Sequence, residues 1–272
     1  MKQILSILVI LASAAFGHGT GAHHHTEVPR SARTPAAAHH RVARSSCPAM
    51  PTAAPAGYRT VVRDDFSGRS LDARTWYRWS GEPGSDPFGW WRTPLGVAGR
   101  GALRLRGIWA SAGANPSWRA GGEVTSGIGS RHAQLYGEYQ WCMKVDRMPG
   151  TSTIALLWPA PDRWPPEIDL FETKGATDGY SVSVHYGTAR QNRIVRANVT
   201  HQDATRWNVY TAIWKPRFLR ILENARVVAT IAGNAHVPAV PMRFDLQTQA
   251  VRPHATRGAT TVDWVVEYAP TR

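Results

Sequence analysis

The chain has 272 residues, a net charge of +13, 12 Trp and only 2 Cys. All the Trp lie between Trp76 and Trp264, which indicates that the folded part begins in the fifties. Residues 1–57 carry +4 of the charge and the rest is scattered singly, with no basic helix, zinc-finger spacing or aromatic ribonucleoprotein motif, so nucleic acid is not the expected partner.

Residues 1–17 have the pattern of an export signal. Lys2 supplies a positive charge, an apolar run covers 4–15, and small residues follow. The run is too short to span a bilayer comfortably. We expect a secreted, extracellular protein that keeps no membrane attachment after signal cleavage. An uncleaved anchor is the alternative.

Residues 18–57 are rich in Ala, Pro, Thr, Arg and His and contain almost no large apolar residue. Such a segment cannot bury enough surface to offset the entropy of ordering, so we expect a disordered linker. Its two His clusters, 23–25 and 39–40, can bind a metal ion, but ligands on a flexible segment are not preorganised. We interpret them as solvated linker histidines and assign no metal site.

The two cysteines lie far apart in the sequence. Cys47 falls in the expected linker and Cys142 in an apolar strand. Export permits a disulfide, because secreted proteins meet an oxidising compartment, and a buried free thiol at Cys142 is an equal alternative. The spacing does not decide between them.

Residues 58–272 read as one all-β domain. Short alternating or apolar runs are divided by Gly, Pro, Asn and Asp, with no long stretch at helical period; examples are 102–106, 136–145, 181–186, 207–215, 227–231, 242–249 and 262–268. Regularly spaced strands with turn signals predict a β-sandwich or barrel.

Two of these strands alternate polar and apolar residues. In 181–186 and 242–249 the apolar residues predict a core face. The opposite side would present Ser181, Ser183, His185, Arg243, Asp245, Gln247 and Gln249. Such a face is either an ordinary solvated surface or the floor of a groove for a hydroxyl-rich polymer.

Three carboxylates crowd a short apolar strand, at Glu167, Asp169 and Glu172. Clustered carboxylates repel one another, so the arrangement costs stability unless a function requires it. In a regular strand Glu172 would point into the core, but a one-residue bulge near Leu170 and Phe171 returns it to the side of the other two acids. Two converging carboxyls are what a retaining glycosidase needs, one as nucleophile and one as acid/base.

At these residues the chain resembles glycoside hydrolase family 16, whose members carry an E-x-D-x-E or bulged E-x-D-x-x-E strand on a concanavalin A-like β-jelly roll. The bulged form is similar to the laminarinase type. Further similarities are the segments 64–76, 136–140, 203–216 and 262–265, so the resemblance covers about residues 58–268. It implies a sandwich jelly roll with a concave substrate groove.

Carried over to this chain, the resemblance implies Glu167 as nucleophile, Glu172 as general acid/base and Asp169 as their helper. The expected substrate-binding residues are Trp164, His185, Gln247 and Trp91, with Trp90, Trp109 and Trp118 as weaker stacking candidates. Two departures from the family put sugar contacts in doubt. Pro165 and Pro166 stand where many members have glycines, and Gln247 stands near the position of a family asparagine.

We therefore expect a secreted, retaining endo-β-glycanase acting on β-1,3 or mixed-linkage glucan. A transglycosylase, a hydrolase of galactans such as agar or carrageenan, and a non-catalytic lectin-like module are the alternatives. The chemistry needs no cofactor. The family resemblance allows a structural Ca²⁺, whose ligands the sequence does not place. The expected partner is the polysaccharide alone, and the expected state is a monomer.

Overall fold

The computed structural model describes residues 46–81, 88–92, 97–98, 101–110, 122–233, 236–253 and 257–271. The regular structure of these residues consists of β-strands, and none of them forms a helix that could cross a membrane. The all-β prediction is confirmed. The expected export signal and linker residues 18–45 lie outside the described residues.

The strands form two antiparallel-dominated sheets. The ten-stranded sheet contains β1 (Tyr58–Asp64), β3 (Gly89–Trp91), β4 (Val97–Ala98), β5 (Leu103–Ala110), β6 (Gly122–Thr125), β8 (Gly137–Val145), β13 (Asn208–Lys215), β14 (Phe218–Glu223), β15 (Arg226–Ala232) and β17 (Gly258–Pro270). The seven-stranded sheet contains β2 (Trp76–Arg78), β7 (Gly127–Ser130), β9 (Thr151–Pro159), β10 (Glu167–Glu172), β11 (Gly179–Thr188), β12 (Gln191–Thr200) and β16 (Met242–Ala250). Its spatial order is β12-β11-β10-β9-β16-β7-β2.

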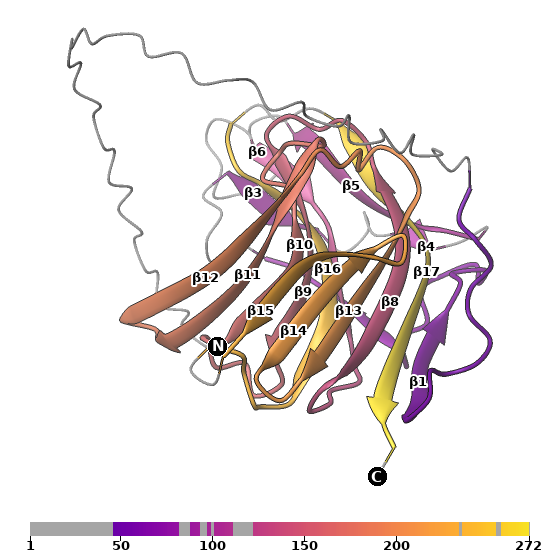
Figure 1. Ribbon diagram of the computed structural model, residues 1–272. Coiled ribbons are helices and arrows are strands. Elements are labelled where there is room, and N and C mark those ends of the chain that lie inside the picture. Colours follow the sequence, from indigo (N-terminus) through magenta and orange to yellow (C-terminus); the bar gives the residue numbers. More distant parts are fainter. Residues whose placement is uncertain are drawn as a thin grey trace, which may run out of the picture. The chain divides into compact units, whose positions relative to one another are not determined.

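The two sheets lie face to face, with β13 to β15 in front of β9, β10 and β16 in Figure 1. Alternating apolar residues from both sheets fill the space between them. The ring of Phe244 on β16 lies 5.8 Å from Tyr139 and 5.4 Å from Trp141, both on β8. Val182 and Val184 of β11 are fully buried in the same core, as their alternation predicts.

The N-terminal described segment is attached to the domain by a disulfide bond between Cys47 and Cys142. The carbonyl of Pro48 accepts a hydrogen bond of 2.9 Å from the indole of Trp264, and Met50 packs against the cluster that surrounds Cys142. Residues 46–57, which we assigned to the disordered linker, therefore lie on the ten-stranded sheet. These residues are ordered on the sheet because the disulfide anchors them there, and the spacing of the two cysteines did not decide whether that disulfide forms.

Candidate active site

Strand β10 carries the three acids, and its backbone departs from regular pairing between Asp169 and Glu172. Glu167 pairs with His185 and Asp169 with Ser183, after which the register shifts and Glu172 pairs with Ser181. The bulge that the sequence predicts at 170–171 is confirmed. It places Glu172 on the same face as Glu167 and Asp169, while the residues between them are buried in the core.

Glu167 and Asp169 are held by neighbours on the same face. The Trp164 indole donates a hydrogen bond of 2.7 Å to Glu167 Oε2. Asp169 Oδ2 accepts one of 3.1 Å from the Ser183 hydroxyl, and His185 Nε2 lies 3.3 Å from the same oxygen. These contacts fix the two carboxylates and leave few rotamers open to them.

Glu172 has a separate set of partners. Its Oε2 accepts a hydrogen bond of 3.1 Å from the Ser181 hydroxyl and lies 3.5 Å from Lys174 Nζ. Glu172 also lines a pocket of about 380 Å³, whose other polar walls include Lys174, Asn198 and His201. This carboxylate is thus accessible from the polar face of the sheet.

The electrostatics of the cluster favour protonated acids. Burial raises the pKa of Glu167 well above its usual range, Asp169 raises it further, and the Trp164 hydrogen bond opposes both effects. Burial followed by the Asp169 charge also raises the pKa of Glu172, while Lys174 holds that pKa down. Carboxyls this close to one another do not all ionise together, so the cluster keeps a proton at a pH where a solvated carboxyl has lost it.

We call the polar face of the seven-stranded sheet that carries the three acids the catalytic face. Strand register places on it, from β12 to β2, Arg196, Asn198, Ser181, Ser183, His185, Glu167, Asp169, Glu172, Ile154, Leu156, Trp158, Arg243, Asp245, Gln247 and Tyr77. The polar faces predicted for 181–186 and 242–249 therefore belong to one surface that includes the acids.

Trp164 and His185 lie together at the Glu167 end of this face. Their ring centroids are 5.9 Å apart. The Asn192 amide donates to His185 Nδ1 over 3.0 Å, which in the neutral ring leaves Nε2 as the donor toward Asp169. Both residues thus contact the acids, in agreement with a place in the site.

The other expected sugar-binding residues differ in position. Gln247 is on the catalytic face but is only 5% exposed, with its amide donating to Gln249. Trp91 is buried and its indole donates to the Thr248 carbonyl, so it does not fit the stacking role that we expected. Its local sequence could not reveal that a neighbouring ring covers it. Trp118 and the side chain of Trp109 lie outside the described residues.

The ring that meets Trp91 edge-on is Trp79, at a centroid distance of 4.5 Å. Tyr77 lies over Gly129 of β7, where a Cβ atom would collide with the phenol ring. Trp79 lies over Gly127, where a Cβ atom would make a tight contact with the indole. Our sequence analysis missed both residues. Alternation from the buried Trp76 was the signal that could have found them, since it puts 77 and 79 on the opposite face.

No group of three or more His, Cys, Asp or Glu side chains within the described ranges is placed to hold a metal ion. The structural Ca²⁺ that the family resemblance allows remains a prediction, because carbonyl oxygens also serve as its ligands.

Paired carboxyls on one polar face of a two-sheet β-sandwich are what a glycoside hydrolase requires, since one carboxyl attacks or activates water and another protonates the leaving oxygen. The family model described as Glycosyl hydrolases family 16 matches residues 109–266. The chain belongs to this family.

Solved structures of similar fold agree with this assignment. LamA of Z. galactanivorans, solved with laminaritriose and laminaritetraose, is 14% identical, with a TM-score of 0.67 over 77% of this chain and 98% of that chain. A structure described with endo-acting O-glycanases of the human gut microbiota is 16% identical, with a TM-score of 0.69 over 82% and 94%. A β-1,3-1,4-glucanase (lichenase) from a mouse hindgut metagenome is 21% identical, with a TM-score of 0.62 over 77% and 99%. No curated protein sequence matches the chain.

Proposed function

We propose that the protein is a secreted, retaining endo-β-glycanase that cleaves β-1,3 or mixed-linkage glucan by double displacement. The observation that carries the proposal is the bulge in β10, which puts Glu167 and Glu172 on one face with Asp169 between them. Retention requires a nucleophile and an acid/base close enough to serve the same anomeric carbon, and one strand supplies both.

In the first step Glu172, whose pKa is raised by burial, donates its proton to the glycosidic oxygen. Glu167 attacks the anomeric carbon as that bond breaks, and the glycosyl–enzyme ester forms. In the second step Glu172, now ionised, takes a proton from water, and the water displaces Glu167. Glu167 must be ionised when it attacks, and the hydrogen bond that the Trp164 indole donates to its Oε2 favours that ionised form.

Secretion is part of the same proposal. The sequence pattern of residues 1–17 predicts an export signal. The Cys47–Cys142 bond supports an oxidising destination, since disulfides persist in secreted proteins and are rare in the cytosol. Mass spectrometry of protein recovered from the culture medium should find a chain that starts near residue 18.

The fold alone does not choose the substrate, because the structures compared above are named for different glycans. The test is a panel of laminarin, lichenan, agarose and chitin, assayed with residues 46–272 and with Glu167→Gln. Hydrolysis of laminarin or lichenan that Glu167→Gln abolishes is the expected result. Hydrolysis of agarose alone would replace the glucan by a galactan, and binding without turnover of any polymer would favour a lectin-like module.

A further inference from the structure

A second polar cluster lies on the catalytic face, on the β16 side of the acids. Leu157 of β9 pairs with Ile168 of β10, so the next residue of β9, Trp158, lies opposite Glu167. On its other side Trp158 pairs with Arg243 of β16. At a strand spacing of about 4.8 Å, Arg243 lies about 10 Å from Glu167 across the sheet. The cluster is therefore close enough to Glu167 for one glycan chain to contact both.

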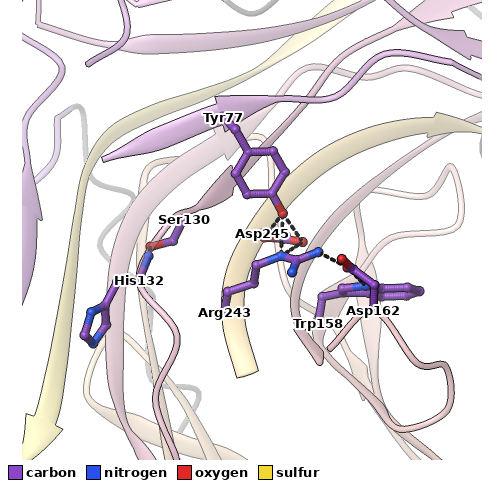
Figure 2. Close-up of polar contacts among 7 residues, drawn as sticks. All are labelled: Tyr77, Ser130, His132, Trp158, Asp162, Arg243 and Asp245. Atoms are coloured by element: carbon purple, nitrogen blue, oxygen red, sulfur yellow. Dashed lines mark hydrogen bonds and ion pairs between the residues drawn. The ribbon is translucent and has the colours of Figure 1, made fainter. Parts of the chain in front are cut away.

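The members of this cluster are connected in a continuous network (Figure 2). Arg243 donates from Nε to the Tyr77 hydroxyl and from Nη2 to Asp162 Oδ1, each over 2.5 Å. The Tyr77 hydroxyl donates to the fully buried Asp245 over 3.3 Å, and Arg243 Nε lies 3.8 Å from that carboxylate. Trp158 Nε1 donates to Asp162 Oδ1 over 3.1 Å. One oxygen of Asp162 thus ties the indole to the guanidinium.

Asp162 is the exposed end of the network. Its side chain is 68% exposed, whereas that of Arg243 is 16% exposed. Its backbone has φ of 56°, a left-handed conformation that non-glycine residues seldom adopt, within a turn closed by its own N–H on the Pro159 carbonyl. Asp162 Oδ1 takes both hydrogen bonds, and Oδ2 accepts none from the part of the chain that the structure describes. Asp162 Oδ2 can therefore accept a hydrogen bond from a ligand that lies beside the Trp158 indole.

We propose that Trp158 and Asp162 form a sugar-binding subsite next to Glu167, and that Tyr77, Arg243 and Asp245 are positioning residues for it. The inference rests on the proposed glycanase function and restricts the substrate to glycans that present a free hydroxyl at this subsite. The Trp158 indole would pack on the apolar face of a sugar ring, while Asp162 Oδ2 accepts a hydrogen bond from a hydroxyl of the same sugar. A carboxylate oxygen accepts hydrogen bonds, so the bound sugar must present a free hydroxyl as the donor. A sulfate ester or carboxylate at that position has no hydrogen to donate to Oδ2.

The test compares the wild-type protein, Asp162→Asn, Tyr77→Phe and the control Asp65→Asn, an exposed turn aspartate next to β1 of the other sheet. On laminarin, Asp162→Asn should raise KM about 10- to 100-fold, the effect of losing a hydrogen bond to a charged group, at unchanged kcat and melting temperature. Tyr77→Phe should raise KM by up to about 10-fold, and Asp65→Asn should match the wild type. A twofold change or less for Asp162→Asn, or a loss confined to kcat, overturns the subsite.

Sulfated laminarin supplies the second measurement. The wild type should hydrolyse it with a lower kcat/KM than laminarin, and Asp162→Asn should reduce that preference. A wild-type preference for the sulfated polymer overturns the inference. If the wild type hydrolyses no polymer, the proposed function fails, and calorimetric binding of laminarihexaose then tests the subsite alone. Equal Kd for the wild type and Asp162→Asn, or no binding, would overturn it as well.

Discussion

Removal of the Cys47–Cys142 bond should destabilise the domain without changing its activity. The bond closes a loop with a sequence separation of 95 residues. Chain-entropy theory assigns a loop of that length about 4.7 kcal/mol of stabilisation. For a domain of this size, each kcal/mol shifts the melting temperature by about 2 to 4 °C, so the loss should be about 10 to 20 °C.

The variant for this experiment is Cys47→Ala with Cys142→Ala, which leaves no free thiol at the buried position. Urea denaturation at 25 °C should show the free-energy loss, while kcat/KM should stay at the wild-type value, because the bond lies on the sheet opposite the acids. The control is the wild type under reducing conditions, which should approach the variant. A loss below about 1 kcal/mol, or a fall in kcat/KM at 25 °C, would refute the entropic account.

Three further predictions concern single residues. In Lys174→Met the cation that holds down the pKa of Glu172 is lost, so the alkaline limb of the kcat/KM profile should move to higher pH; an unchanged or lower limb would contradict Glu172 as the general acid. In Gly129→Ala a Cβ atom would meet the Tyr77 hydroxyl, which should cost about 1 to 3 kcal/mol in urea denaturation, and a neutral result would argue against that close packing. Burial raises the pKa of Glu267 from 4.5 to about 8 in the folded protein, so unfolding releases a proton and stability should fall between these pH values by up to about 5 kcal/mol. Glu267→Gln should make the fall smaller without abolishing it, because the raised pKa values of Glu167 and Glu172 act in the same direction, and an unchanged slope between pH 5 and 8 would count against the prediction.

The acids and their bulge could be predicted because the constraint is local. A carboxylate such as Glu172 cannot face an apolar core without a partner, so the register of a six-residue strand had one acceptable solution. The polar faces of the two alternating strands followed from period two in the same way. That they form one surface with the acids was not predictable from alternation, since it depends on strand order in the sheet.

The positions of the indole rings, in contrast, could not be predicted from local sequence. Trp91 and Trp79 are both near the start of the domain, and only the packing of one ring against the other decides which is covered. The network from Tyr77 to Arg243 joins residues 166 positions apart. No local pattern in the sequence reports such a contact. The disulfide was undecided for a similar reason, because it depends on where the chain before β1 returns across the ten-stranded sheet.

Proton NMR of the first product tests the central claim most directly. A polymer that the wild type hydrolyses is monitored during the first minutes, before mutarotation mixes the anomers. Double displacement by Glu167 and Glu172 predicts that the β-anomer of the new reducing end appears first. Initial appearance of the α-anomer would contradict a covalent intermediate on Glu167 and would require an inverting mechanism on this strand.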